Sequence, residues 1–407
     1  MHLRLFFLIT KKLVMHTEPD TIIVRFSGEI GIKSEWTRRA YEKQALQNLK
    51  GALKSADLKP VAIERMRGRI YVKTQQPAET AKVLTRVFGI TSVSPAKQTT
   101  SDFKMMTEAT LAMTEAIIKD HTTFAVRCHR VGTHPYSSVE VCRDLGEQIL
   151  EAYQPRSPKV NLTNPQVTIT VEVRDQEAYV YAQTLQGAGG FPIGTQAKTV
   201  CLLSGGIDSP VACWLTMKRG CPTVPIYVDN SPYTDERAKQ KAIETARRLK
   251  EWSAGYIKKM YIVPNGENMK AIQQKTPERF ACLFCKRLMY RIAERIADAE
   301  DAVGIVTGEA IGEQASQTMQ NLYVIDEAAT RYPIHRPLLG FDKIETEAIA
   351  RKIGTFEVST MKAQGCTAAP SMPSTQAKLA AVKEAEKNLD MDAMAEAAVQ
   401  AAEIIPL

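Results

Sequence analysis

The spacing of apolar and polar residues in the first half of the chain alternates between two periods. Short runs with alternating or continuous apolar residues predict strands at 21–26, 69–74 and 124–131, and a hairpin within 160–183 that turns at 174–177. Amphipathic stretches predict helices at 36–56, 78–89, 103–120 and 137–153. The second helix is expected to end at Gly89, because glycine suits a C-cap. This half is therefore predicted to be α+β.

The pattern changes after a glycine-rich segment at 187–194, which is a candidate linker. Largely apolar runs at 198–203, 222–228, 258–264 and 302–308 predict buried strands, and the stretches 236–252 and 286–300 between them predict helices. Alternating strands and helices predict an α/β domain with a doubly wound parallel sheet. The Ala/Glu/Lys-rich tail after Pro373 is expected to be helical.

The segment CLLSGGIDSP, residues 201–210, ends the first of these apolar runs and carries the clearest chemistry. In a doubly wound sheet, ligands bind at the carboxyl ends of strands. Paired glycines let backbone N–H groups approach an anion, and the N-terminus of the next helix favours negative charge. The loop lacks the lysine of a Walker A motif. It therefore predicts a different phosphate site, in which Asp208 holds Mg²⁺ on the phosphates.

SGGxDS after a strand resembles the PP-loop of ATP pyrophosphatases, which cleave ATP between the α and β phosphates. Further stretches resemble the tRNA 4-thiouridine synthetase (ThiI) family and occur in the same order as in that family. They lie between about Thr21 and Cys366 and read IIVRFSGEIGIKS, VNLTNPQVTITVEV, SPYTDERAKQKAIE, CKRLMYRIAERIA and TGEAIGEQASQT. The resemblance implies a ferredoxin-like domain at 21–85, a THUMP RNA-binding domain at 86–186 and a PP-loop catalytic domain at 187–373. Residues 1–20 are left as an unassigned N-terminal extension and 374–407 as a helical C-terminal tail.

The resemblance also implies a reaction and a set of site residues. ATP would adenylate the C4 oxygen of uridine 8 in tRNA, and sulfur would displace AMP to give 4-thiouridine, with Asp208 and Cys366 as catalytic residues. Implied ATP contacts are Leu202, Leu203, Ser204, Gly205, Gly206, Asp208, Ser209, Tyr227, Val228, Lys286, Gly308 and Gln317. From the sequence alone, Lys286 can instead be a helix-surface lysine and Gln317 a helix cap or surface amide. Arg287 suits a tRNA phosphate and a nearby Glu equally well.

The cysteines raise a separate question about the sulfur donor. Cys366 matches the family's PP-loop-domain cysteine, which in some relatives works with a persulfide on a rhodanese domain. The chain ends at Leu407 without room for that domain, which argues against the relay and against a role in thiamine biosynthesis. Cys282 and Cys285 form a CxxC, as in archaeal-type members, and with Cys366 could hold an iron–sulfur cluster with one open iron that binds sulfide. A redox dithiol remains an alternative. So does zinc, although its nearest possible fourth ligand, His335, is not in a recognisable spacing. We expect His335 to be structural or to face tRNA.

Charge adds the expected partner. The formal net charge is +8, and between Thr21 and Lys97 there are 15 Lys and Arg against 6 Asp and Glu. Such a basic block suits tRNA, although a solvated basic surface explains it equally well.

The apolar run near the N-terminus is too short to span a membrane, and Met15 is an alternative start. We expect a cytoplasmic enzyme with reduced cysteines, a homodimer being possible, that takes sulfur from sulfide or a persulfide carrier. The competing functions are a tRNA-binding adaptor with a vestigial ATP site and another PP-loop tRNA-modifying enzyme.

Overall fold

The computed structural model describes residues 18–66 and 68–407, which divide into two compact units. The first unit contains most of the chain up to Gly189, and the second contains residues 190–407 together with 33–52 and 87–89. The predicted N-terminal extension lies almost entirely outside the described residues. None of the helices in the described ranges is long and apolar enough to cross a membrane.

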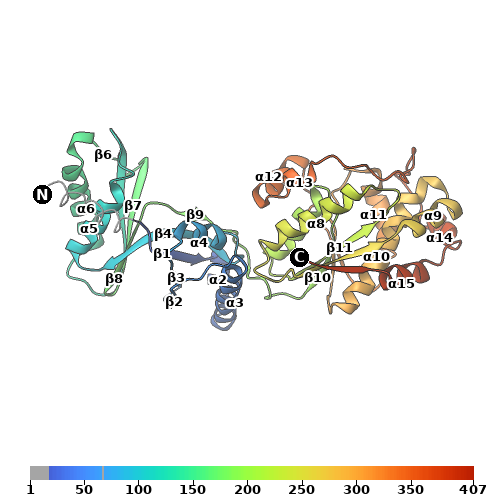
Figure 1. Ribbon diagram of the computed structural model, residues 1–407, viewed down its shortest axis with the longest axis horizontal. Helices are drawn as coiled ribbons and strands as arrows, with labels where there is room; N and C mark the ends of the chain where they lie inside the picture. The colour runs from blue at the N-terminus through green and yellow to red at the C-terminus, as the bar shows by residue number, and fades with distance from the viewer. Residues whose placement is uncertain (1–17, 67) are drawn as a thin grey trace, which may run out of the picture. The chain divides into compact units, whose positions relative to one another are not determined.

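The first unit is built on one nine-stranded sheet in the order β2–β3–β1–β4–β8–β7–β5–β6, with β9 pairing to β4 (Figure 1). Its strands are β1 (Thr21–Phe26), β2 (Ala62–Met66), β3 (Arg69–Lys73), β4 (Ile90–Thr100), β5 (Thr123–Val131), β6 (Lys159–Val160), β7 (Val167–Arg174), β8 (Glu177–Tyr181) and β9 (Leu185–Gln186). Its helical segments are α2 (Gly28–Gly31), α4 (Pro77–Leu84), α5 (Phe103–Thr114), α6 (Ser138–Ala152) and η1 (Gln154–Arg156).

Strand β4 joins the two predicted N-terminal domains into this single sheet, and the sequence pattern does not reveal it. Its sequence, ITSVSPAKQTT, is largely polar and contains Pro95, a residue that usually marks an edge strand. On one side β4 pairs with β1 at 90–96, while on the other it pairs with β9 at 92–93 and with β8 at 97–100. Pro95 therefore lies in the gap between β9 and β8, which makes a proline acceptable in a central strand.

A buried ionic cluster also connects the two parts of this unit. The carboxylate of Glu172 on β7 is 1% exposed, and it accepts hydrogen bonds from Arg174 (2.8 Å) and from the hydroxyl of Tyr71 on β3 (3.0 Å). Arg25 on β1 and Arg69 on β3 lie within 3.7 and 3.5 Å of the same carboxylate. Burial raises the pKa of Glu172, but the hydrogen bond and charge of Arg174 and the other two arginines outweigh it and leave the pKa below its usual value.

The second unit contains a six-stranded sheet in the order β14–β13–β10–β11–β12–β15. The strands are β10 (Thr199–Leu202), β11 (Thr223–Asp229), β12 (Lys259–Pro264), β13 (Ile305–Val306), β14 (Ile334–His335) and β15 (Glu403–Pro406). The helical segments are α3 (Glu35–Ser55), which extends into the first unit by its last residues, α7 (Asp208–Lys218), α8 (Glu236–Lys250), α9 (Gly266–Lys275), η2 (Glu278–Phe280), α10 (Ala281–Ala299), η3 (Ala315–Gln317), α11 (Met319–Asp326), α12 (Lys343–Ile353), α13 (Phe356–Ser359), α14 (Leu379–Glu386) and α15 (Met391–Gln400).

Helices cover both faces of this sheet, as Figure 1 shows. Helices α7, α8, α12 and α13 pack together on one face, and α9, α10, α11 and α15 on the other. Every neighbouring pair of strands is parallel except β12 with β15. The predicted doubly wound α/β fold is confirmed. Since the chain runs from β10 outward to β12 and then returns to β13 on the other side of β10, the topological switch point lies between β10 and β13, where such sheets bind ligands.

Three predicted element boundaries differ from the structure. Helix α4 ends at Leu84 rather than Gly89, because Val87 and Phe88 leave the helix to become buried, the Phe88 ring lying 5.4 Å from that of Trp214. Helix α5 ends at Thr114 rather than 120, because the chain turns there to bury Ile118. The tail is not helical throughout, since its last residues form β15 beside β12.

Helix α3 lies mainly with the second unit, although the sequence predicts it within the ferredoxin-like domain. The side chain amide of Gln44 donates to the Tyr256 hydroxyl (2.9 Å), and that of Asn48 donates to the Ile193 carbonyl (2.9 Å). At Gly51 an added Cβ would lie 2.7 Å from the Ala254 carbonyl oxygen. The missing side chain at this position lets the helix backbone approach the second unit closely.

Candidate active site

The loop at 204–209 follows β10 at the switch point and is closed by its two serines. The Ser209 hydroxyl accepts from the Ser204 backbone N–H (2.8 Å) and lies 2.9 Å from the Ser204 hydroxyl. The Gly206 N–H donates to the Ser204 hydroxyl (3.2 Å). These bonds curl the loop at the start of α7, and a glycine-containing loop that leads into a helix N-terminus is an arrangement that favours bound phosphate.

Neighbouring segments leave no space for side chains at two glycines of this site. At Gly205 an added Cβ would lie 2.7 Å from Cβ of Lys241 on α8, whose ammonium donates to the Met361 carbonyl (2.9 Å). At Gly308, which follows β13, an added Cβ would lie 2.5 Å from the backbone N of Ser209. The structure therefore brings Gly308 directly against the PP-loop, as expected for two segments that flank the switch point.

The predicted residues at the ends of β10 and β11 lie at the same edge of the sheet. β10 ends at Leu202, which is aligned with Ile226 on the parallel strand β11, and Leu203 follows directly. Tyr227 and Val228 follow Ile226 and are 6% and 8% exposed. Burial, followed by the charge of Asp229, raises the pKa of Tyr227 to about 12, so this hydroxyl stays protonated at neutral pH.

Asp208, which begins α7, is paired with a lysine that the sequence analysis did not select. The Lys343 ammonium lies 2.8 Å from the Asp208 carboxylate and 3.2 Å from that of Glu313. Lys343 begins α12, within the segment HRPLLGFDK. Only the packing of α12 against α7 reveals that this lysine faces the PP-loop.

Lys286 lies on α10 and donates to Glu309, the residue after Gly308, at 2.7 Å. Glu309 is 5% exposed, and its carboxylate also accepts from Arg336 (2.7 Å) and the Tyr290 hydroxyl (2.9 Å). Burial raises the pKa of Glu309, but the Lys286 and Arg336 cations outweigh it and lower the pKa to about 2. Lys286 is therefore not a simple surface lysine. Neither Glu309 nor Arg336 was selected from the sequence, although Glu309 lies in the TGEAIGEQASQT stretch.

The structure also bears on the alternatives for Arg287 and Gln317. Arg287 is 1% exposed and donates to Glu386 (3.0 Å) and Glu327 (2.8 Å). Of its two expected partners, a tRNA phosphate and a nearby Glu, the structure therefore shows the Glu. Gln317 is 6% exposed rather than a surface amide, and among the described residues its side chain oxygen has no hydrogen-bond partner. A buried acceptor without a donor is costly, which makes Gln317 a candidate ligand contact.

The three cysteines singled out from the sequence are neighbours in the structure. Cys282 and Cys285 lie in the first two turns of α10, and Cys366 lies in the coil after α13, where the Thr367 N–H donates to the Tyr233 carbonyl (2.8 Å). Burial raises the pKa of Cys285 to about 12, and the negative charges of Cys282 and Cys366 add to the increase. Burial and Cys366 raise the pKa of Cys282 as well.

Two amides face the sulfur of Cys285. The side chain N–H groups of Asn230, just after β11, and Asn265, just after β12, each lie 3.9 Å from the Cys285 sulfur. Asn265 is 1% exposed and donates to the Asn230 side chain oxygen at 2.7 Å. Among the described residues, no three His, Cys, Asp or Glu side chains already surround a common metal position. His335 is exposed on β14.

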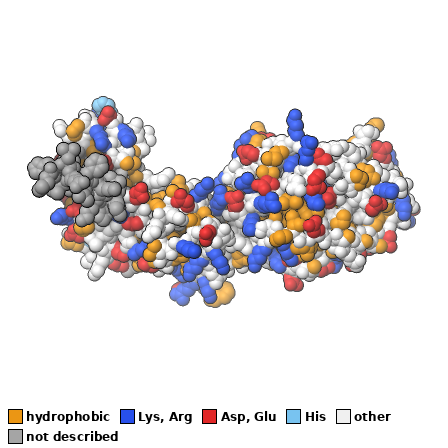
Figure 2. All heavy atoms as spheres, in the orientation of Figure 1, with side chains coloured by type: hydrophobic (Ala, Val, Ile, Leu, Met, Phe, Trp, Pro, Cys, Tyr) orange, Lys and Arg blue, Asp and Glu red, His pale blue; other side chains and the backbone are white. Residues whose placement is uncertain are grey.

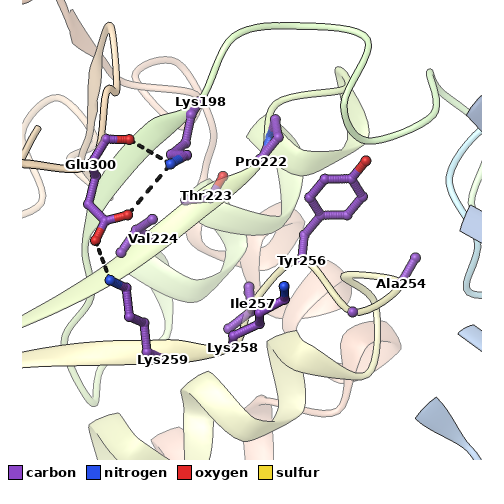
Figure 3. Close-up of a pocket in the computed structure, with 11 residues that line it drawn as sticks. Lys198, Pro222, Thr223, Val224, Ala254, Tyr256, Ile257, Lys258, Lys259 and Glu300 are labelled. Atoms are coloured by element: carbon purple, nitrogen blue, oxygen red, sulfur yellow. Dashed lines mark hydrogen bonds and ion pairs between the residues drawn. The ribbon is translucent and has the colours of Figure 1, made fainter. Parts of the chain in front are cut away.

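A separate hollow of about 590 Å³ lies at the opposite, amino-terminal edge of the sheet (Figure 3). Lys198 and Lys259 point from two sides toward Glu300, with ammonium–carboxylate distances of 3.5 and 2.6 Å, and Lys198 also donates to the Glu300 backbone carbonyl (2.5 Å). Helices α7, α8 and α10 end at this edge, and helix C-termini favour cations. These lysines are therefore explained by the fold.

Comparison with known proteins decides the family. The family described as "Thiamine biosynthesis protein (ThiI)" matches residues 194–391, the THUMP domain matches 100–183, and the ThiI ferredoxin-like domain matches 21–94. A probable tRNA sulfurtransferase of Methanosarcina acetivorans is 38% identical over 392 residues, which cover 96% of this chain and 94% of that protein. A second, of Methanosarcina mazei, is 39% identical and covers 96% of each chain. The chain belongs to the tRNA sulfurtransferase (ThiI) family.

The solved structures agree with this family membership. A 4-thiouridine synthetase in complex with RNA and bound ATP superposes with a TM-score of 0.86 at 30% identity, covering 96% of this chain and all of that one. PH1313 from Pyrococcus horikoshii superposes with a TM-score of 0.65 at 26% identity, over 82% of this chain and 99% of that one. The predicted family is confirmed, and so is the predicted order of ferredoxin-like, THUMP and PP-loop folds.

Proposed function

We propose that this protein is an ATP-dependent tRNA sulfurtransferase that converts uridine 8 of tRNA into 4-thiouridine. One observation carries the proposal. Two consecutive residues of α10 reach opposite halves of the site: Cys285 contacts the residues that follow β11 and β12, whereas Lys286 contacts the residue after Gly308. Thiol chemistry and nucleotide chemistry therefore meet at one helix turn. The relative solved with RNA and bound ATP is a 4-thiouridine synthetase, which supports the same substrates here.

The proposed reaction has two steps, adenylation of the uridine and displacement of AMP by sulfur. The C4 oxygen of uridine attacks the α-phosphorus of ATP, and the bond to pyrophosphate breaks. A sulfur nucleophile then attacks C4, and the C–O bond to the adenylate breaks to release AMP. The N-terminus of α7 and the glycine-containing loop before it would bind the phosphates, and Asp208 would hold Mg²⁺ there once Lys343 is displaced. Such fixed donors stabilise charge that develops on the departing pyrophosphate.

The nucleotide contacts expected from the family remain part of this proposal. The Gln317 side chain oxygen needs a donor, and the adenine amino group is one. Lys286 would pair with a phosphate while retaining Glu309, because an ammonium has three donors. Leu202, Leu203, Tyr227 and Val228 would line the base and sugar with largely apolar surface, as ligand pockets require.

The sulfur source is proposed to involve Cys282, Cys285 and Cys366. The donor set fits an iron–sulfur cluster in chemistry, because three neighbouring thiols leave one iron without a cysteine ligand and amide N–H groups face Cys285. Since the thiols do not already surround a common position, at least one of them must rearrange on binding. When bound, such a cluster would supply a site for sulfide. The alternative is that these thiols act without a cluster, as a catalytic dithiol or through a disulfide with Cys366.

tRNA is the proposed acceptor, and the exposed basic face of α3 would contribute to its binding. Lys and Arg side chains gather over this helix in Figure 2. They include Arg39, Lys43, Lys50 and Lys54, all exposed. Contacts of this kind to phosphates give affinity that falls steeply with salt.

The test is an anaerobic reaction of purified protein with unmodified tRNA, Mg-ATP and sulfide, followed by digestion and mass spectrometry. We expect 4-thiouridine at position 8 and one AMP per modified nucleoside. Release of AMP without thiouridine would support adenylation but contradict sulfide as the donor. If neither AMP nor thiouridine is formed, the enzyme assignment is contradicted and a tRNA-binding adaptor is favoured.

A matched set of variants tests the thiols. Cys282→Ala/Cys285→Ala should lose iron and thiouridine but still release AMP. Cys221→Ala, a half-buried cysteine outside the site, should lose neither. Full activity and iron content in the double variant would overturn the assignment of the thiols.

A further inference from the structure

Glu309 makes contacts that divide cleanly between its two carboxylate oxygens. We propose that Glu309 is a positioning residue: it anchors itself through Oε2 and uses Oε1 to hold the Lys286 ammonium toward the nucleotide. This inference rests on the proposed function, because it takes Lys286 to contact ATP.

The Oε2 atom is fixed from three directions. It accepts from the Tyr290 hydroxyl (2.9 Å), the Thr307 hydroxyl (3.1 Å) and Nε of Arg336 (2.7 Å). These donors come from α10, the end of β13 and the segment after β14, so the carboxylate is held by three separate parts of the unit. Arg336 is itself fixed by the carboxylate of Asp326 (3.0 Å) and by the Tyr290 hydroxyl (2.9 Å).

The Oε1 atom has a single partner among the described residues, the Lys286 ammonium at 2.7 Å. The Lys286 side chain is 20% exposed, in contrast to 7% for Glu309, so the ammonium lies at the boundary between the buried network and the open side of the site. Glu309 directly follows Gly308, which packs against Ser209 of the PP-loop. The fixed carboxylate therefore presents the lysine beside the phosphate loop.

A lysine needs such a partner if it is to act at one position. Its four-carbon chain has many rotamers, and the entropy lost on fixing them opposes a productive orientation. Arg336 already supplies Glu309 with a cation and has Asp326 as a second carboxylate. Because Arg336 is shared between two carboxylates, Lys286 also helps to neutralise Glu309, and the orienting role rests on the geometry of the Oε1 contact: a carboxylate fixed through Oε2 gives the ammonium one defined position.

The substitution Glu309→Gln distinguishes the roles of the two carboxylate oxygens. A glutamine can keep its oxygen on the three anchoring donors, but it then places an amide N–H group opposite the Lys286 ammonium, where two donors cannot bond. The anchor is retained and the Lys286 contact is lost. A matched control is Glu327→Gln, which removes a carboxylate from Arg287, the next residue of α10, away from the PP-loop.

The experiment measures tRNA-dependent AMP release for wild type, Glu309→Gln, Lys286→Ala and the double variant, with Glu327→Gln beside them. Loss of one charge-assisted hydrogen bond should lower kcat/KM for ATP on the order of ten- to a hundredfold in Glu309→Gln. In the Lys286→Ala background the same substitution should change kcat/KM by less than about threefold, because residues acting as a unit are not additive. Glu327→Gln should match wild type.

If the double variant is active and its loss of kcat/KM equals the product of the losses caused by Glu309→Gln and Lys286→Ala, the positioning role is overturned and the proposed function stays intact. Wild-type kinetics for Lys286→Ala would overturn both the lysine's nucleotide contact and its positioning. If Glu309→Gln does not fold, Glu309→Asp takes its place. That variant keeps the charge, but its side chain is one methylene too short to reach both the three anchoring donors and the Lys286 ammonium. It should therefore show the same loss of kcat/KM for ATP. Wild-type kinetics would overturn the proposal.

Discussion

The Lys343 ammonium lies 2.8 Å from the carboxylate of Asp208, although 135 residues separate them in sequence. The same ammonium reaches Glu313 at 3.2 Å. The carboxylate expected to bind Mg²⁺ is thus paired with a cation supplied by the protein itself. Mg²⁺ and Lys343 must compete for Asp208.

This competition predicts that Lys343→Met increases the affinity of the nucleotide-free protein for Mg²⁺. A partly exposed ion pair contributes up to about 1 kcal/mol, so we expect about two- to fivefold tighter binding by calorimetry. Lys352→Met on the same helix should leave the affinity unchanged, because Lys352 lies over the Trp214 ring instead. Equal Mg²⁺ affinity for wild type and Lys343→Met would show that Asp208 does not bind the metal.

A second prediction concerns Gly308. In Gly308→Ala the new methyl group would lie 2.5 Å from the Ser209 nitrogen and 2.6 Å from its Cα, which are backbone atoms that cannot simply rotate away. The PP-loop must shift, and we expect ATP binding, measured by equilibrium dialysis, to weaken at least about tenfold. Gly340→Ala is the control, since nothing lies within 4 Å of a Cβ there. An unchanged affinity for both variants would mean that the loop tolerates displacement.

The lowered pKa of Glu309 predicts a pH-dependent contribution to stability. Its pKa in the folded protein is about 2, below the ordinary value of 4.5, so the stabilisation is complete above that ordinary value and is lost as the pH falls toward 2. The difference in unfolding free energy between wild type and Glu309→Gln should therefore shrink on the order of 2 kcal/mol between about pH 5 and pH 3. Urea unfolding at the two pH values measures it. A difference independent of pH would mean that Glu309 titrates normally.

Burial of Cys285 predicts slow alkylation in the iron-free protein. The thiolate is the reactive form, and a pKa of about 12 leaves very little of it at neutral pH. Iodoacetamide at about pH 8 should label Cys285 at least a hundredfold more slowly than the same cysteine in urea-unfolded protein, and the rate should increase with pH up to about 12. Peptide mapping by mass spectrometry separates the cysteines. Rapid labelling of folded protein would contradict a buried, protonated thiol.

Local patterns in the sequence were sufficient for the elements that carry the phosphate loop. A strand, two glycines, Asp208 and a helix start are all specified within ten residues, and the alternation of strands and helices predicts the parallel sheet around them. The CxxC and Cys366 were also identifiable as residues. Strand β4 was missed, because its polar composition and Pro95 conceal a strand whose neighbours come from distant parts of the chain.

Only the tertiary structure decided which side chains meet. The pairs Lys286–Glu309, Lys343–Asp208 and Asn265–Cys285 join residues that are 23, 135 and 20 positions apart. The sequence offers no local signal for such pairs, because their distances depend on how strands order in the sheet and on which face each helix covers. A hydrogen-bonded loop is a property of a few adjacent residues, whereas a charge partner is a property of the packed fold.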